Sequence, residues 1–481
     1  MSARRPAAAA LALALAGCGT SDPSPVWPAP GTGPAAPVSA PAVAGPAASG
    51  DPSVDPVEAA ENARRSQKML EVVARMRALP VKKPVPGRTL SRGKMLERIR
   101  AHVDKDVPRA VLFDQGESLA ALGLVPADYD FVEGIFALLE GQIAGFYEPD
   151  DGTMYLADDL GEEEAAATLS HELVHALQDQ SFSLKDMLDF APGEGDRTTA
   201  AHALAEGDAM VAMFDVMAGG PTDIPVEAVR LSATASMAMT ASTAATPRAL
   251  QASLIAPYVD GFRLVQGLRK RGGWPAVDAV WRKLPETTEQ LLHLDKLDAR
   301  EPAVKVPTPP VSALGATGRS PSTSPWASRG CASPSPTGHR TPWPSRPPQV
   351  GAAIAAWWRA ASRRRDATAG LSHRAEAGRA VALAWSLVMD SDADAAEVAA
   401  ILAKQWGGAG ARAASGCKER EDLGPAAWAR KGKALAFVAG PFQRSGKAAK
   451  SLSDCKAAST WAGAVLASAA ASPAPVTAAA R

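Results

Sequence analysis

The feature that most constrains this chain is a pair of histidines, His171 and His175, with Glu172 between them. The residues just before the pair, 161–168, are rich in acidic side chains and then in alanine, which favours the first turns of a helix. Side chains four positions apart lie about 40° apart on one helix face, so both imidazoles can reach one cation. Glu172 falls on the flank, where it can take a proton from a metal-bound water without binding the metal. The spacing therefore predicts a metal site in the middle of a helix.

Two other interpretations of the motif are weaker. A chance coincidence on a solvated helix would be rare, because the 481 residues include only 7 His. A structural zinc site rich in thiolates needs cysteines, and none of the four lies near the motif.

A catalytic zinc site needs a third protein ligand and an open position. A compact motif with a third nearby His is excluded, because Gln178 and Ser181 occupy the positions that it would need as Gly and His. The predicted helix 198–214 offers Glu206 and His202, which lie one turn apart on the same face, so either could be the third ligand. Gly207 beside Glu206 permits a close approach of the two helices.

An imidazole that binds a metal is usually oriented through its other ring nitrogen. Asp179 and Asp208 are the candidates for this role.

The first 18 residues favour export and lipidation. Arg4 and Arg5 precede an apolar run, which ends in a Leu-Ala-Gly-Cys tetrad at Cys18. The tetrad resembles the lipobox of bacterial lipoproteins, which implies membrane attachment through an acyl chain on Cys18. Because Gly19 rather than an acid follows, the resemblance implies the outer membrane of a bacterial cell envelope. The alternative is an alanine-rich disordered start with an incidental cysteine.

Composition divides the remaining chain. Lys plus Arg and Asp plus Glu are equal at 51 each, so the overall charge gives no sign of a nucleic-acid surface. Residues 19–57 are rich in Pro and Ala and predict a disordered tether. A catalytic domain is expected over 58–302, an α+β region over 375–465 and a disordered tail over 466–481. No acidic residue stands between Glu301 and Asp366, so 303–374 is either a disordered linker or a stretch translated out of frame.

Periodicity predicts an α+β fold that is mostly helical. The strongest strand signal is a hairpin over 142–156, whose turn is Asp-Asp-Gly, directly before the motif helix. The uncharged run 232–246 is compatible with either a buried helix of small residues or a mobile loop. Helices are expected at 56–79, 90–103, 116–122, 131–139 (with a break at Pro126 and a cap at Asp128), from Pro257 onward, and at 274–284, 380–389 and 395–406; a strand is expected at 434–440.

Two cysteines, Cys417 and Cys455, share the C-terminal region. In an oxidising envelope they can form a disulfide. Two free buried thiols are the equal alternative.

Four blocks together resemble a known family: the run from His171 to Gln180, the Gly-Phe-Tyr-Glu-Pro hairpin, the Ala-Glu-Gly-Asp-Ala block and Pro-Tyr-x-x-Gly-Phe at Tyr258. They look like gluzincin-type, peptidase-MA-like zinc metallopeptidases, and the resemblance covers about 101–302. It implies a zincin-like fold with a small sheet before the active-site helix. It also implies one Zn²⁺ held by His171, His175 and Glu206, with Glu172 as general base. Tyr258 then either supports the transition state or only packs at a helix start.

The sequence thus leads to the expectation of a lipid-anchored zinc metallopeptidase that acts on peptides or proteins. A catalytically silent zinc-binding or cell-wall-binding scaffold is the alternative from another class. Glu172 argues against it, because a structural site needs ligands but no base. A hydrolase acting on another amide also remains open.

Overall fold

The computed structural model describes residues 56–107, 109–184, 195–239, 246–302, 322–323, 369–372, 380–389, 391–408 and 413–470. Cys18, the predicted signal and tether, and nearly all of 303–374 lie outside the described residues. The fold is mixed α+β, as expected. None of the described helices is long and apolar enough to cross a bilayer.

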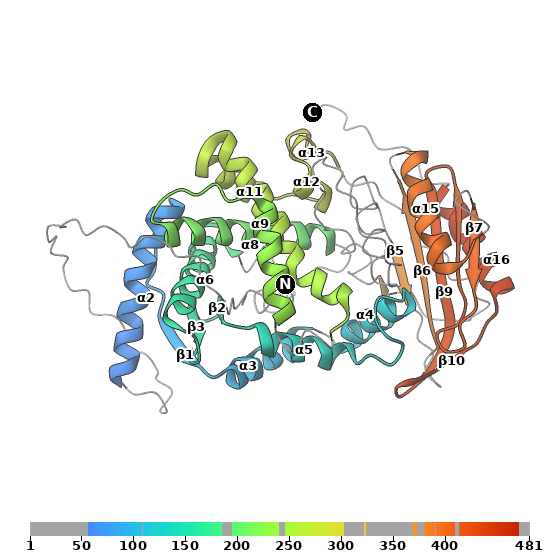
Figure 1. Ribbon diagram of the computed structural model, residues 1–481, viewed down its shortest axis with the longest axis horizontal. Helices are drawn as coiled ribbons and strands as arrows, with labels where there is room; N and C mark the ends of the chain where they lie inside the picture. Colours follow the sequence, from blue (N-terminus) through green and yellow to red (C-terminus); the bar gives the residue numbers. More distant parts are fainter. Residues whose placement is uncertain are drawn as a thin grey trace, which may run out of the picture.

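The first part of the chain wraps helices around a three-stranded sheet of order β1-β3-β2 (Figure 1). β2 and β3 form the expected antiparallel hairpin, and β1 adds to β3 in parallel. Its elements are α2 (Pro56–Arg77), β1 (Gly87–Leu90), α3 (Arg92–Asp106), α4 (Arg109–Ala121), α5 (Phe131–Gln142), β2 (Gly145–Glu148), β3 (Thr153–Ala157), α6 (Glu162–Phe182), α8 (Gly195–Ala218), α9 (Val226–Met239), α11 (Arg248–Arg282), α12 (Thr288–Leu292) and α13 (Leu294–Ala299).

Two glycines let α8 and α11 pack backbone against backbone. A Cβ at Gly261 would stand 1.7 Å from the carbonyl oxygen of Ala203, and one at Gly207 would stand 1.9 Å from the carbonyl carbon of Gly261. No side chain fits there, so both positions require glycine. The close helix approach expected at Gly207 is confirmed, and it brings α11 against the helix that carries Glu206.

The C-terminal part is a twisted sheet between two helices (Figure 1). Its path is β4-β5-β6-β9-β8-β7, and β10 pairs with β9. α15 packs on one face with the aromatic core around Phe437, and α16 packs on the other around Trp461. The elements are β4 (Ser322–Thr323), β5 (Ala369–Ser372), β6 (Ala380–Val388), α15 (Asp392–Trp406), β7 (Ser415–Lys418), β8 (Ala426–Lys431), β9 (Ala434–Ser445), β10 (Ala448–Ser451) and α16 (Cys455–Ala470).

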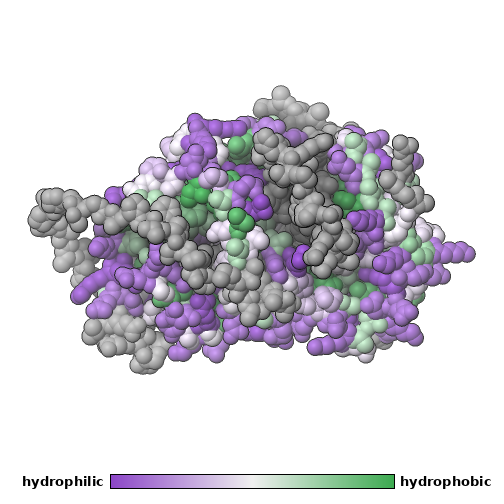
Figure 2. Space-filling view, in the orientation of Figure 1, coloured by the Kyte–Doolittle hydropathy of each residue, from purple (hydrophilic) through white to green (hydrophobic). Residues whose placement is uncertain are grey.

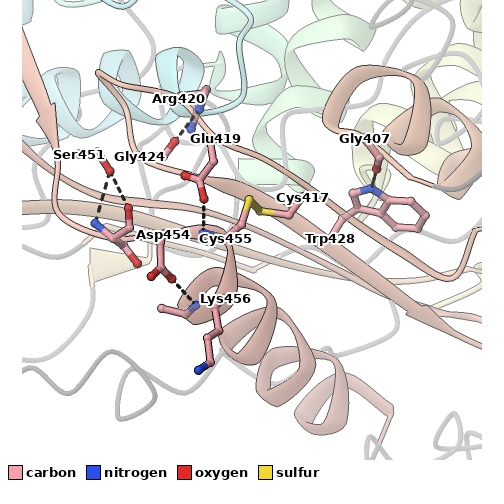
Figure 3. Close-up of a disulfide and its surroundings, with 12 residues drawn as sticks. Gly407, Cys417, Glu419, Arg420, Gly424, Trp428, Ser451, Asp454, Cys455 and Lys456 are labelled. Atoms are coloured by element: carbon pink, nitrogen blue, oxygen red, sulfur yellow. Dashed lines mark hydrogen bonds between the residues drawn. A yellow bond between two sulfur atoms is a disulfide. The ribbon is translucent and has the colours of Figure 1, made fainter.

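The disulfide in this part joins Cys417 on β7 to Cys455, the first residue of α16 (Figure 3). It links the edge strand of the sheet to the helix that covers one face. Beside it, the Glu419 carboxylate accepts a hydrogen bond from the Cys455 N–H at 2.6 Å. The structure therefore has the paired alternative rather than two free thiols.

The C-terminal sheet packs on α4. Residues of α4 and the following loop share one core with β6, α15 and β9. Around this core, Arg444 makes a two-pronged ion pair with Glu117, at 2.9 and 2.6 Å, and Arg420 donates to the Ala121 carbonyl at 3.0 Å. Figure 2 shows that hydrophilic residues cover most of the described surface on the face drawn.

One expected helix is a strand. Residues 380–389 were predicted to be helical, but β6 runs from Ala380 to Val388. Alternate side chains of β6 enter the two cores on opposite faces of the sheet: Leu383 points towards α15 and Ala384 towards α16. Because both faces are covered, the strand reads as one apolar run without alternation, and such a run does not distinguish strand from helix.

Other boundaries also differ. α11 begins at Arg248 and contains Pro257, where a helix start was predicted, and it continues through a kink at Gly272 and Gly273 into the separately predicted 274–284 helix. The cap of α5 is Asp130, which accepts from the Glu133 N–H, and not Asp128. Within the undecided run 232–246, residues 232–239 are helical in α9, and 232–236 are exposed or half-buried rather than buried. The predicted tail begins too early, because α16 continues to Ala470 with Ala469 buried.

Candidate metal centre

The two motif histidines lie side by side in the middle of α6. The helix starts with three glutamates in its first turn, where acidic side chains favour the helix dipole. Further along the same helix, His171 and His175 are almost fully buried, and their Nε2 atoms stand 3.2 Å apart. Both rings therefore present the same nitrogen to one point.

The third group at that point is Glu206, from α8, which packs beside α6 (Figure 1). Its Oε2 lies 3.3 Å from Nε2 of His171 and 3.6 Å from Nε2 of His175. Ligand atoms at 2.0–2.1 Å from a tetrahedral zinc lie about 3.3–3.4 Å from one another. The three observed separations match that spacing, so these residues fit a tetrahedral ion with one position left for water or substrate.

His202 contacts the other side of the same carboxylate. Its Nε2 stands 2.9 Å from Oε1 of Glu206, one helical turn away. At this point, ligand atoms of His171, His175 and Glu206 converge as a group that could hold a metal ion. Between the two alternatives for the third ligand, the geometry favours Glu206, and His202 fixes its carboxylate.

The orienting residue of His175 is Gln178, which the sequence did not single out. Oε1 of Gln178 lies 2.8 Å from Nδ1 of His175, and its Nε2 donates to the Ala205 carbonyl at 3.0 Å. An amide oxygen that accepts from Nδ1–H leaves Nε2 as the ligand atom. Gln178 thus fixes the orientation of the His175 imidazole and connects α6 to α8 at the residue before Glu206.

The two aspartates predicted for this orienting role have other partners. Asp179 accepts a hydrogen bond from the hydroxyl of Tyr147 at 3.1 Å. Asp208 is fully buried, forms an ion pair with Arg77 and accepts from the indole of Trp281 at 2.8 Å. The orienting role of the two aspartates stays a prediction.

Glu172 is completely buried beside the ligands. Its Oε2 accepts the backbone N–H of Tyr147 on β2 at 3.0 Å, while its Oε1 has no hydrogen-bond partner among the described residues. Removal from water, with the negative Glu206 close by, raises the pKa of Glu172 to about 8. The Tyr147 N–H thus holds Oε2 of Glu172 in place, and Oε1 can accept a proton.

The charges at this centre require a positive partner. Although burial works to raise it, the pKa of Glu206 lies well below its usual range because of the His175 charge and hydrogen bonds from the imidazoles. Burial alone would lower the pKa of His175, but the Glu206 carboxylate raises it to about 9. A buried carboxylate here is stabilised either by protons on the imidazoles or by a cation that replaces them.

Tyr258 lies next to this group. It is buried on α11, and its ring centre is 6.2 Å from that of His171. The helix start predicted at Pro257 is wrong, so Tyr258 occupies the interior of a long helix. Its place beside His171 follows from the glycine crossing of α8 and α11 at Gly261.

Comparisons with family models, curated proteins and solved structures return no match to this chain. The function proposed below is therefore inferred from the geometry of the metal centre.

Proposed function

We propose that this protein is a zinc-dependent metallopeptidase. The observation that supports this most is the combination at one buried point: three ligand atoms 3.2–3.6 Å apart and the carboxylate of Glu172 with one unpartnered oxygen. A zinc ion supplies Lewis acidity that polarises the scissile carbonyl and acidifies a water. His171, His175 and Glu206 would hold it.

Glu172 is the general base in this proposal. Its Oε1 accepts the proton of the attacking water and returns it to the leaving amine, as in general acid–base catalysis. The Tyr147 N–H keeps the other oxygen fixed during both transfers.

A peptide is the substrate class that the neighbouring sheet favours. β2 ends the three-stranded sheet, and its residue Tyr147 contacts the base. An extended peptide can pair with an end strand through its backbone groups, here those other than the Tyr147 N–H, which Glu172 already accepts, and this would lay a scissile bond along α6. We place this activity at the bacterial envelope, with Cys18 as the lipid attachment point and the outer membrane as the membrane concerned.

A digest of a peptide library by the full-length protein tests the proposal. We expect cleavage that stops on treatment with a chelator and returns with stoichiometric Zn²⁺. A protein that binds Zn²⁺ in one equivalent but cleaves no peptide in the library would favour the silent scaffold.

A further inference from the structure

A second group of metal-binding side chains lies at the far end of the hairpin. It consists of His102 on α3, Glu148 at the end of β2 and Asp150 in the turn. One ligand atom of each lies within 4.8 Å of the others. The imidazole comes from a helix more than forty residues before the two carboxylates, so the convergence is produced by the fold and not by local sequence.

The spacing between the two better-buried members fits a shared ion. Nδ1 of His102 and Oε2 of Glu148 are 3.9 Å apart, which is too long for a hydrogen bond. In a tetrahedral zinc site, two ligand atoms that each lie about 2.0–2.2 Å from the ion are about 3.3–3.6 Å apart, so a shift of a few tenths of an ångström brings these two atoms to that spacing. The side chains of His102 and Glu148 are only 16% and 15% exposed. Asp150 is exposed and leaves a route from solvent.

The charge of the turn also favours a cation. Glu148, Asp150 and Asp151 place three carboxylates within four residues. Arg98 pairs with Asp151 at 3.3 Å, and Tyr155 donates to the same carboxylate at 2.9 Å, so these partners serve Asp151. Burial raises the pKa of Glu148 and the neighbouring aspartates add to the rise, while His102 and the Asp150 N–H, which donates to Oε1 of Glu148 at 3.4 Å, work against it. A carboxylate that is mostly removed from water among like charges is stabilised by a bound cation.

We propose that His102, Glu148 and Asp150 form a second divalent-cation site, separate from the His171 centre. One imidazole nitrogen and two carboxylate oxygens, with the remaining positions open to water, suit a first-row transition ion such as Zn²⁺. Ca²⁺ prefers oxygen ligands alone. An ion there joins α3 to the end of β2, the strand whose Tyr147 N–H holds Glu172.

Calorimetric titration with Zn²⁺ tests this site without reference to peptidase activity. The full-length His171→Ala/His175→Ala protein removes the first centre. We expect this protein to bind one equivalent of Zn²⁺ and to bind Ca²⁺ at least about tenfold more weakly. Adding His102→Gln should weaken the Zn²⁺ affinity at least about tenfold. His293→Gln, which removes an imidazole at the start of α13, is the matched control and should leave the affinity unchanged.

Asp150→Asn keeps the proposal testable if His102→Gln does not fold, because Asp150 is exposed in the turn. We expect the same loss of Zn²⁺ affinity, and melting in the absence of metal should match that of the parent protein. In the parent, Zn²⁺ should raise the melting temperature, and in the variants this increase should disappear. Unchanged Zn²⁺ binding in both His102→Gln and Asp150→Asn, or Ca²⁺ binding stronger than Zn²⁺, would overturn the second site. Neither result bears on the His171 centre.

Discussion

At Glu206, one carboxylate has two separate tasks. Oε2 faces the two imidazoles of α6, and Oε1 lies against His202. The sequence could place Glu206 and His202 on the same helix face, but it could not decide between them. The choice depends on how α8 is rotated against α6, and the crossing with α11 at Gly207 and Gly261 sets that rotation.

We therefore expect Glu206→Ala to lose most of the zinc bound at the His171 centre, because the substitution removes one ligand and leaves two. His202→Ala should keep zinc, since it removes only a partner of the ligand. Zinc stoichiometry after dialysis against a weak chelator measures the difference. Full occupancy in Glu206→Ala together with loss in His202→Ala would reverse the assignment.

The motif residues His171, Glu172 and His175 could be found from spacing, because i, i+4 geometry follows from the helix alone. Gln178 could not. Its role depends on the Ala205 carbonyl of another helix, and no local pattern reports that contact. A Gln three residues after a ligand His on the same face is the available signal.

Asp260 is a buried carboxyl with no hydrogen-bond partner among the described residues. Burial raises the pKa of Asp260 from its ordinary value of 3.8 to about 7. The folded state therefore holds a proton that the unfolded state has already lost, so stability falls as pH rises from about 4 to about 7. We expect Asp260→Asn to flatten this part of the stability profile.

Urea unfolding at pH 4, 5, 6 and 7 measures that slope in both proteins. Asp298→Asn, at an exposed ion pair with Arg271, is the control and should follow the wild type. Parallel profiles of Asp260→Asn and wild type would show that Asp260 ionises at its ordinary pKa in the folded protein.

At the scale of elements, the hairpin and α6 could be predicted because their signals are local: Asp-Asp-Gly gives the turn, and the acidic first turn gives the helix start. β6 could not, because its apolar residues face two covered sides at once. β1 also has no local signal of its own, and it forms by adding to β3.

α2 is attached to the ligand-bearing helix by a buried charge network. Arg77 is fully buried and pairs with Asp208 on α8 and with Asp278 on α11, at 2.7 Å for the second pair. Removing the Arg77 guanidinium leaves the buried Asp208 carboxylate without its positive partner.

We expect Arg77→Met to lower the free energy of unfolding by about 3–5 kcal/mol, as measured by urea denaturation. Arg75→Met, on an exposed face of the same helix, is the matched control and should change stability by less than about 0.5 kcal/mol. Equal effects of the two substitutions would mean that Arg77 contributes no more than a surface charge.

Across the whole chain, the sequence could separate the region that holds the His171 centre from the C-terminal region, since composition changes sharply between them. It could not show that they share a core. The apolar residues of α4 and β6 stand about 260 positions apart, and Arg444 and Glu117 are 327 positions apart. Only the folded chain brings them together.

Membrane attachment is proposed through Cys18. The Leu-Ala-Gly-Cys tetrad that ends at Cys18 resembles a lipobox, so an acyl chain on this residue is the anchor that we expect. Cys18→Ser should move the protein from the membrane fraction to the soluble fraction and leave peptidase activity unchanged. A Cys18→Ser protein that still sediments with membranes after a salt wash would exclude the lipid anchor.

Glu172 is the proposed base of a zinc centre held by His171, His175 and Glu206. Zinc content and peptide hydrolysis, determined together on Glu172→Gln, test this role, because the substitution keeps the size of the side chain and the acceptor for the Tyr147 N–H. We expect the zinc content of the wild type, with hydrolysis lowered by about a hundredfold or more. Hydrolysis equal to that of the wild type would contradict the role of Glu172 as base.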